Sequence, residues 1–423
     1  MVASLAGVSE GTVTAKPAAG SATTSTSTES KSTRTVKTVT ILVVAPASGA
    51  TKESGDAALR AVKLAIAHAT EDRLLPSGWG VEVETIDETA KSGPAAAVGR
   101  KLKKEADIVA VIGALAPSTA SPLEAMAAKQ NTTLLVLSPA SAPHIGGATA
   151  ATSAPVSGSV TATVASSLPA APLTLRMLTD DTTAGTYAAA YTLTSAVAAI
   201  AKPPTVTTSE AGENARAFTM AVDARLVASG ASVTALGLAS TDSGRLTPAF
   251  VTKVFEGAPP LVVFGGKVET GLPLSSAARA RQPQATFLSG SQDGVAGCAD
   301  ALSALGEGDL CAVGATPLSM SLRARAFRED YAAAGYGAPT VSVTAAYDAA
   351  MLVILALRPA IGTLGAEPDP GAVRAPLMDA LRTARLDGAT GSTTFDGGGN
   401  RVTSVLSVLR KQGGRWVAVA ATG

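Results

Sequence analysis

The chain has 423 residues, 46% hydrophobic and only 3% aromatic, with 34 basic and 33 acidic side chains. This length exceeds one typical domain core, and the apolar content is ample for the cores of two lobes. A formal net charge of +1 argues against nucleic acid or an anionic membrane surface as the main partner.

Residues 1–35 are rich in Thr, Ser and Ala. Such a composition cannot bury enough surface to order itself, so we expect a disordered tether here. Residues 1–11 lack the basic and apolar regions of a signal peptide, and no Cys follows them as a lipid-attachment site. Export is therefore not visible in the sequence itself.

The folded part is expected to begin at Val39, where a β-branched run typical of a strand buried on both faces starts. A loop and a helical pattern with Leu59, Val62 and Ile66 follow it, and then a second strand at 81–86. Ala-rich helical stretches separate the later strands, expected at 108–112, 134–137, 173–178, 232–236, 261–264 and 286–288. This alternation predicts doubly wound α/β layers.

Two apolar strands end in small hydroxyl residues: Val111-Ile-Gly-Ala-Leu-Ala-Pro-Ser-Thr119 and Leu137-Ser-Pro-Ala-Ser-Ala-Pro143. Ligands of open α/β sheets bind at the carboxyl ends of strands. Ser121-Pro-Leu-Glu124 has the form of a capping box and predicts a helix directly after Ser118 and Thr119. Its positive end would favour a ligand carboxylate beside these hydroxyls. The alternative is that they are ordinary loop residues.

Cys298 and Cys311 are the only cysteines and lie thirteen positions apart. We expect a disulfide, because two cysteines without a nearby His pair do not make a zinc site. The alternative is two buried free thiols. No apolar stretch is long enough to cross a bilayer, since the longest, at 349–357, lies between Asp348 and Arg358.

An enzyme is not expected from the sequence. The chain has only two histidines, His68 and His144, no Gly-x-Ser-x-Gly elbow, and no carboxylate cluster at metal-binding distance from a His. We therefore expect neither a catalytic site nor a metal or cofactor. The glycine run 397–399 predicts a turn rather than a phosphate loop, and alternating strands around Gly413-Gly-Arg415 predict a hairpin.

From about residue 36 to the end, the chain resembles the periplasmic binding proteins of the branched-chain amino acid type. The resemblance rests on ordered local similarities that include both hydroxyl segments. The others are Val43-Val-Ala-Pro-Ala-Ser-Gly-Ala50 with Gly55, Asp180 to Gly185, Phe264-Gly-Gly266, Ser289-Gly-Ser-Gln-Asp-Gly-Val-Ala296 and Gly391-Ser-Thr-Thr-Phe-Asp-Gly-Gly-Gly-Asn-Arg401.

This resemblance implies the type I periplasmic binding protein clamshell, an α/β fold with two doubly wound parallel-sheet lobes joined by a three-strand hinge. Lobe one would comprise residues 36–155 and 315–406. Lobe two would comprise residues 156–314 and 407–423.

The resemblance also implies a ligand site. Ser118, Thr119, Ala140 and Ser141 would hold a carboxylate, and Asp293 would pair with an α-ammonium from the opposite lobe. Three further positions, where family members usually carry aromatic rings over the ligand, hold Ser54, Ala184 and Lys267. Lys267 in the cleft would favour an acidic ligand, and the alternative is a surface lysine.

The implied function is an extracytoplasmic solute-binding protein of an ABC importer, which closes on an amino acid or a similar small carboxylate-bearing ligand. Its partner would be a membrane permease. The Thr/Ser tether fits a surface-anchored lipoprotein or a secreted protein. Two alternatives are a ligand-sensing domain with the same fold and a ligand-free cell-envelope interaction protein.

Overall fold

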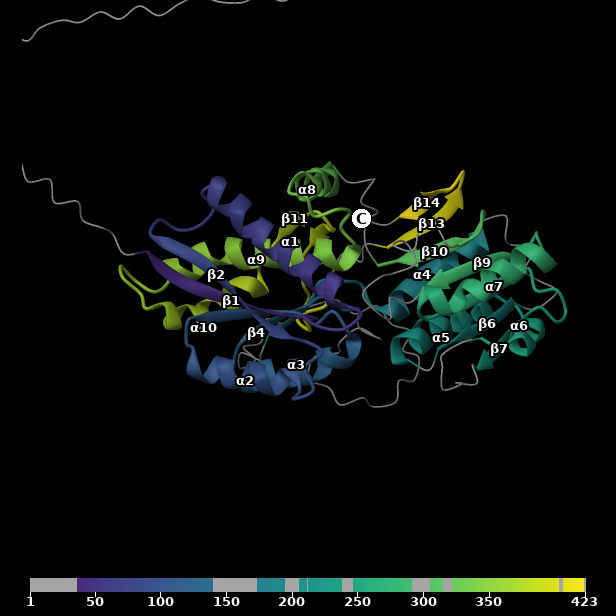
Figure 1. Cartoon of the computed structure of the whole chain (residues 1–423), viewed down its shortest axis with the longest axis horizontal. Coiled ribbons are helices and arrows are strands. Elements are labelled where there is room, and N and C mark those ends of the chain that lie inside the picture. The colour runs from purple at the N-terminus through teal and green to yellow at the C-terminus, as the bar shows by residue number, and fades with distance from the viewer. Residues whose placement is uncertain are drawn as a thin grey trace, which may run out of the picture. The chain divides into compact units, whose positions relative to one another are not determined.

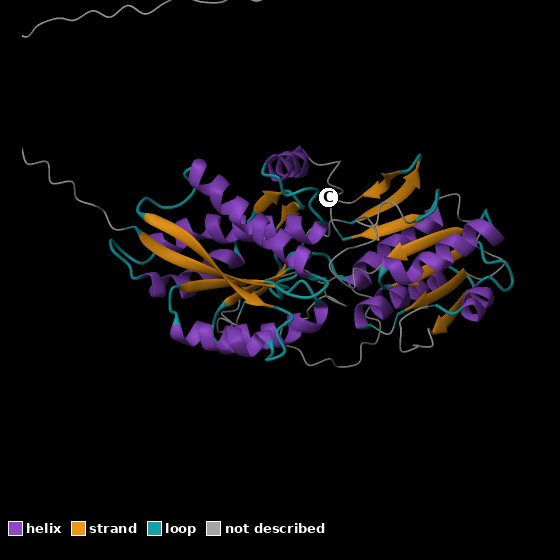
Figure 2. Cartoon of the chain, viewed as in Figure 1, coloured by secondary structure: helices purple, strands orange, loops and turns teal. Residues whose placement is uncertain are grey.

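Strands of this chain form two large sheets and a small two-stranded ribbon (Figures 1 and 2). The computed structural model describes residues 36–139, 173–194, 205–210, 212–237, 246–290, 305–314, 322–402 and 406–421. Each large sheet carries helices on both faces, which is the doubly wound arrangement predicted from the sequence.

The first sheet has five parallel strands in the order β2-β1-β3-β4-β5. This order is that of a doubly wound sheet whose chain reverses direction between β1 and β3. The strands are β1 (Lys37–Ala45), β2 (Trp79–Asp87), β3 (Ile108–Ile112), β4 (Thr133–Val136) and β5 (Thr174–Arg176).

Alternate side chains of β1 enter different cores. Val39, Ile41 and Val43 pack on one face, and Leu42 and Val44 pack on the other. Both sets are fully buried, which explains the unbroken β-branched run in the sequence. The first face is covered by α1 (Lys52–Glu71), α8 (Leu322–Ala333), α9 (Val341–Gly362), the 3-10 helix η2 (Pro370–Val373) and α10 (Arg374–Arg382), and the second by α2 (Pro94–Lys104) and α3 (Pro117–Lys129).

The expectation that no stretch is long and apolar enough to cross a bilayer is wrong for helix α9, which is both, but most of this helix is buried inside the protein. Its side chains pack against α1 and β3, in the same core as β1. Asp348 of α9 is also fully buried, and its carboxylate accepts hydrogen bonds from the backbone N–H groups of Ala389 (2.9 Å) and Thr390 (2.7 Å). We therefore interpret α9 as a core helix.

The second sheet repeats the same order in its parallel part, β7-β6-β8-β9-β10, and adds an antiparallel pair beyond β10. Its strands are β6 (Thr205–Ser209), β7 (Val233–Gly237), β8 (Leu261–Gly265), β9 (Thr286–Gly290), β10 (Leu310–Val313), β13 (Ser407–Gln412) and β14 (Arg415–Ala421). One face is covered by α4 (Asp181–Thr194) and α5 (Glu213–Ala228), and the other by α6 (Pro248–Val254) and α7 (Val268–Arg281). The ribbon pairs β11 (Leu386–Gly388) with β12 (Gly391–Thr393).

The predicted C-terminal hairpin is confirmed. β13 and β14 pair antiparallel around Gly413 and Gly414, which both have positive φ angles, as a tight hairpin turn of the primed type requires. The predicted turn at 397–399 is also confirmed, since the N–H of Gly399 donates to the carbonyl oxygen of Asp396 (3.0 Å).

Two details differ from the sequence-based expectations. Helix α3 begins at Pro117, so the predicted capping box at Ser121 is wrong, and Pro122 lies inside the helix. Pro117 provides an earlier start because proline at a first helical position has no N–H to satisfy. Strand β5 pairs with β4 in the first sheet, although the expected boundary at residue 156 placed this segment in lobe two.

Candidate functional site

Both sheets have a point where the chain reverses its winding direction, between β1 and β3 in the first sheet and between β6 and β8 in the second. Crevices at the carboxyl ends of strands beside such points are the usual ligand sites of open α/β sheets. The loops that leave these strands therefore form the candidate site. They contain Ser54, Ser118, Thr119 and Lys267 or lie directly beside them.

The loop after β1 is held by a carboxylate at the end of β2. Asp87 accepts hydrogen bonds from the N–H of Ala47 (2.9 Å), the hydroxyl of Ser48 (2.8 Å), and the N–H (2.9 Å) and hydroxyl (2.7 Å) of Thr89. These bonds, that of Ala47 first, hold the pKa of Asp87 well below its usual range. The loop then passes so close to α1 that a Cβ on Gly55 would lie 1.8 Å from the carbonyl oxygen of Pro46.

Glu88 binds the start of α3. Its carboxylate is 6% exposed and accepts hydrogen bonds from the N–H groups of Leu115 (3.0 Å) and Ala116 (2.8 Å). The Thr119 side chain also hydrogen-bonds to it. Burial raises the pKa of Glu88, while these hydrogen bonds oppose that rise. Ser118 lies in the same first turn of α3 and is exposed.

A second acidic residue binds the start of α7. Glu210 follows β6 and accepts hydrogen bonds from the N–H of Lys267 (3.1 Å) and the hydroxyl of Thr270. Gly266 has a φ of +138°, and a Cβ there would collide with the Glu210 side chain at 2.7 Å. The missing side chain of Gly266 thus makes room for Glu210. Lys267 itself is exposed.

One side chain links the carboxyl ends of the two sheets. The Nδ2 of Asn214, in the first turn of α5, donates to the carbonyl oxygen of Pro139, which follows β4 (3.0 Å), and to Oδ2 of Asp181 at the start of α4 (2.8 Å). Asn214 is 5% exposed and Asp181 is 2% exposed. A buried amide of this kind is costly without its partners, so the contact favours the arrangement in which both are present.

Ser138 precedes Pro139 and belongs to the second predicted hydroxyl segment. Its side chain is 1% exposed, and its hydroxyl has no hydrogen-bond partner within the residues that the structure describes. Such buried hydroxyls are uncommon in native proteins. Ala140 and Ser141, the next two predicted ligand residues, lie outside the described residues, as does His144.

The remaining predicted residues are scattered. Ser54 lies half-buried in the first turn of α1, and Ala184 is 5% exposed in the core between α4 and α5. Cys311 is fully buried on β10. Asp293 and Cys298 lie outside the described residues, so the pairing of Asp293 with an ammonium and that of Cys298 with Cys311 stay predictions.

His68 packs in the protein rather than at the candidate site. Its Nδ1 lies 2.9 Å from the Tyr347 hydroxyl of α9. Within the part of the chain that the structure describes, no group of three or more His, Cys, Asp or Glu side chains could hold a metal ion.

The chain crosses between the sheets after β5, after β10 and before β13. Arg401, shortly before β13, donates from Nη1 to the carbonyl oxygen of Met177 after β5 (3.1 Å) and to the hydroxyl of Thr390 (3.1 Å). Burial lowers the pKa of Arg401 to about 10, with Asp348 opposing this shift. Gly314 after β10 packs closely on Thr179, since a Cβ would lie 3.2 Å from the Thr179 carbonyl oxygen. The three crossings thus run close to one another.

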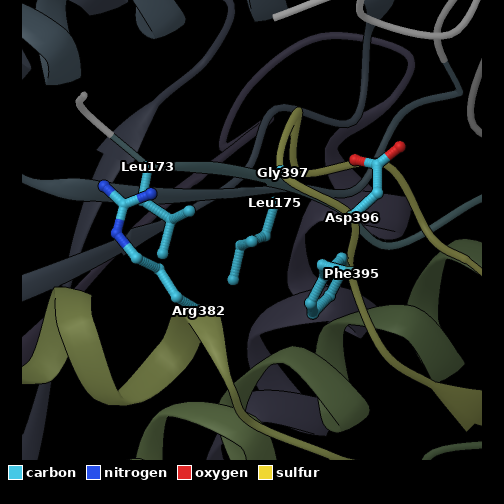
Figure 3. Close-up of a pocket in the computed structure, with 6 residues that line it drawn as sticks. All are labelled: Leu173, Leu175, Arg382, Phe395, Asp396 and Gly397. Carbon is cyan, nitrogen blue, oxygen red and sulfur yellow. The ribbon is translucent and has the colours of Figure 1, made fainter. Parts of the chain in front are cut away.

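A cavity of about 150 Å³ lies elsewhere, beside the edge strand β5. In Figure 3, Leu175 lies between the side chains of Arg382 from α10 and Phe395, while the carboxylate of Asp396 points away from the Phe395 ring. None of the predicted site residues lines this cavity.

Three residues at the candidate site were not identified from the sequence: Glu88, Glu210 and Asn214. Glu88 and Glu210 each directly follow the last residue of a strand. An acidic residue at this place in the sequence is a detectable signal for the carboxyl edge of a sheet. Asn214 gave no such signal, because an Asn in the first turn of a helix is most often a local hydrogen-bonding residue. Asp181, in the segment from Asp180 to Gly185, is buried although it is acidic.

Comparisons with solved structures reveal similar folds at low sequence identity. The leucine binding protein LivK from Thermotoga maritima is 17% identical, with a TM-score of 0.68 over 91% of this chain and 99% of that one. The branched-chain amino acid transporter substrate binding protein LivJ from Streptococcus pneumoniae, in complex with isoleucine, is 19% identical, with a TM-score of 0.66 over 91% and 99%. An ABC transporter solute binding protein from R. palustris, in complex with benzoate, is 14% identical, with a TM-score of 0.66 over 91% and 96%.

No curated protein sequence matches this chain. Residues 38–415, however, match the family described as periplasmic binding protein, which is a solute-binding type with an extracytoplasmic location. This match covers most of the chain and includes every large-sheet strand from β1 to β13. The chain therefore belongs to the periplasmic binding protein family.

Proposed function

We propose that this chain is the extracytoplasmic solute-binding protein of an ABC importer, and that its two lobes close on an amino acid or a similar small carboxylate-bearing ligand. The observation that carries the proposal is the hydrogen bond from Asn214 of the second sheet to Pro139 of the first. It links the carboxyl ends of both sheets, beside the reversal point of the second sheet and one strand away from that of the first, where a ligand between them would be enclosed.

The ligand class is supported by the chemistry near this contact. Ser118 and Thr119 lie in the first turn of α3, and the buried Ser138 hydroxyl follows β4. The hydroxyls of Ser118 and Ser138 suit a carboxylate, whereas the Thr119 side chain already hydrogen-bonds to Glu88. The similar proteins from S. pneumoniae and R. palustris hold isoleucine and benzoate, which both carry a carboxylate. We propose that Ala140 and Ser141 complete this group, that Asp293 pairs with the ligand's ammonium, and that Ser54, Ala184 and Lys267 border the site.

The proposed movement is a hinge closure. Lobe one would contain the first sheet with α8, α9 and α10, and lobe two would contain the second sheet. The three crossings that run together near Met177, Gly314 and Arg401 would form the hinge, because small backbone changes there rotate both sheets without repacking their cores. Ligand binding would then shift the population toward the closed state.

The test is a thermal-unfolding screen of the purified full chain against amino acids, dicarboxylates, amides and short peptides. A ligand that binds only the folded state raises Tm, by an amount that grows with its concentration. Hits are then titrated by calorimetry with the wild type and with Ser118→Ala and Asp293→Ala, and Glu82→Gln on the exposed side of β2 serves as the control.

We expect at least one carboxylate-bearing hit, about tenfold weaker binding in Ser118→Ala, and loss of amino acid binding in Asp293→Ala, because a buried ammonium would lose its counter-charge. If no compound raises the Tm of the folded, ligand-stripped protein, the solute-binding proposal is rejected. That outcome would favour the ligand-free interaction protein.

Two finer features are also proposed. A disulfide between Cys298 and Cys311 would close the loop before β10, and intact mass measured with alkylation before and after reduction tests it. A cell-surface location, as a lipoprotein or a secreted protein, is tested by fractionation of the producing cells, with the permease partner sought by crosslinking.

A further inference from the structure

The cavity beside strand β5 lies apart from the candidate ligand site. Three parts of the chain line it (Figure 3): the β5 segment with Leu173 and Leu175, α10 with Arg382, and residues 395–397 after the β11–β12 ribbon. Strand β5 is the edge strand of the first sheet, whereas the candidate site lies beside the reversal point between β1 and β3. A molecule in this cavity would therefore occupy a different site.

The chain path explains why this space exists. The segment that follows Phe395 runs along the outer edge of β5, where the N–H of Arg176 donates to the carbonyl oxygen of Gly399 (2.9 Å). A Cβ on Gly399 would lie 1.8 Å from the carbonyl oxygen of Thr174, so this close approach requires glycine. A Cβ on Gly397, by contrast, would meet no other described residue within 4 Å. The segment is tight at Gly399 and leaves space beside Gly397.

The inner part of the cavity is apolar. Leu175 is fully buried, Leu173 is 5% exposed, and both belong to the core of the first sheet, against which Phe395 packs. The outer part is polar, because Asp396 and Gly397 are exposed. An apolar cavity of about 150 Å³ can bind a molecule of the size of benzene, and this cavity has about that volume. Its size and its lining fit one small ring or a branched aliphatic group.

The charges at the rim select the polar end of such an occupant. Figure 3 shows the Arg382 guanidinium and the Asp396 carboxylate on opposite sides of Leu175. Oδ1 of Asp396 accepts hydrogen bonds from the N–H groups of Gly398 (2.9 Å) and Asn400 (2.9 Å). Asp396 thus uses its carboxylate within its own turn, and Arg382 is the charged group that an occupant would meet.

The side chain of Arg382 is suited to an anion. Its ion pair with Asp379, three residues earlier on α10, is long at 3.8 Å, and the Asp379 side chain is 70% exposed. A surface pair of this kind contributes little to the position of a guanidinium. A guanidinium carries five N–H donors in a planar fork that matches the two oxygens of a carboxylate.

We propose that this cavity is a second ligand site, which binds a small monocarboxylate with a single ring or a branched aliphatic body. The body contacts Leu173, Leu175 and Phe395, and the carboxylate pairs with Arg382. This site is independent of the proposed ligand site between the lobes. Its occupant would touch both β5 and residues 395–397, shortly before each segment crosses to the second sheet.

Methyl NMR of the purified full chain tests this site. Benzoate is titrated against protein with labelled leucine methyl groups, and benzamide, a neutral molecule of similar shape, is titrated in parallel. The ring of a bound probe shifts the signals of nearby methyl groups, so Leu173 and Leu175 report binding at this cavity. Arg382→Gln removes the charge and Arg382→Lys keeps it. The control is Arg385→Gln, because Arg385 is exposed and does not line the cavity.

We expect saturable shifts at both leucines, and about fivefold tighter binding of benzoate than of benzamide in wild type. Arg382→Gln should abolish this preference, Arg382→Lys should retain part of it, and Arg385→Gln should match wild type. Absent or unsaturable shifts in wild type, or equal binding of the two probes, would overturn the proposal. A benzoate Kd that stays the same in Arg382→Gln would also overturn it, because the probe would then bind elsewhere.

These outcomes are separate from those of the proposed function. The shifts at Leu173 and Leu175 do not depend on whether an amino acid binds between the lobes. A failed thermal screen with positive leucine shifts would reject the solute-binding proposal and keep the second site, and the reverse result would do the opposite.

Discussion

Removal of the Asn214 side chain tests whether the contact between the sheets contributes to ligand binding. Asn214→Ala loses the hydrogen bond to Pro139 and the bond to the Asp181 carboxylate. A neutral hydrogen bond contributes about 1 kcal/mol, and one to a charged group about 2 kcal/mol. Only the first joins the two sheets, so ligand affinity should fall by about 1 kcal/mol, or roughly fivefold in Kd.

Global stability should respond more strongly than affinity. The bond to Asp181 joins α5 to α4 within the second sheet, and its loss leaves a nearly buried carboxylate without this donor. We expect the free energy of unfolding to fall by about 3 kcal/mol in total. Urea unfolding measures this change, and calorimetry with a ligand from the thermal screen measures Kd.

Thr219→Ala is the matched control for this variant. Thr219 is also buried on α5, but among the described residues its hydroxyl bonds only to carbonyl oxygens of its own helix, at Ala215 and Arg216. This control should lower stability without changing Kd. If Asn214→Ala and Thr219→Ala show the same Kd, the contact with Pro139 plays no part in ligand binding and the reasoning is refuted.

Four further predictions follow from described contacts and from the cysteine spacing. Arg401→Met should lower the free energy of unfolding by about 3 kcal/mol in urea, because it leaves the carbonyl oxygens of Met177, Thr390 and Ser392 without this donor, and an unchanged midpoint would contradict this. Gly55→Ala should lower the free energy of unfolding by about 2 kcal/mol or more in urea, since its Cβ would meet the Pro46 carbonyl oxygen. A wild-type urea midpoint would show that the loop after β1 can shift at no cost in stability. Burial raises the folded-state pKa of Glu88, so its contribution to stability is complete below the unfolded-state pKa and is lost as pH rises through the folded-state value. The stability of wild type minus that of Glu88→Gln should therefore be larger at pH 4 than at pH 7, and the opposite trend would reverse the assigned shift. Reduction of the proposed Cys298–Cys311 disulfide should cost about 3 kcal/mol by the loop-closure estimate, a Cys298→Ser/Cys311→Ser protein should lose all sensitivity to reductant, and a wild type insensitive to reductant would reject the disulfide.

Much of the fold could be predicted from hydrophobic patterns. The run at β1 and the hairpin at Gly413 and Gly414 were recognisable because burial on two faces and a tight primed turn each demand particular residue types. Strands β6 and β10 were not expected. β6 reads Thr-Val-Thr-Thr-Ser, and its threonines are buried although their side chains are polar, so composition alone did not reveal a central strand.

The candidate site could be predicted less completely. Ser118 and Thr119 follow directly from the position of a strand end, and α3 carries both. The partner of the helix start could not be predicted, because Glu88 comes from a strand two positions away in the sheet and more than twenty residues away in the chain. Asn214 is harder still, since its contact with Pro139 depends on how two separate sheets meet.

The interleaved chain path has a consequence for biosynthesis. Strand β1, near residue 40, shares a hydrophobic core with α9 at Val341–Gly362, and the second sheet receives its last strands only after residue 406. A ribosome that has made three quarters of the chain has therefore completed neither the core that contains α9 nor the two cores of the second sheet. Such distant contacts slow folding and keep the nascent chain open until its C-terminal part is available. A polypeptide that reaches its native state this late stays incompletely folded for most of its synthesis. An incompletely folded chain can pass through a narrow membrane channel, which a protein that works outside the cytoplasm requires.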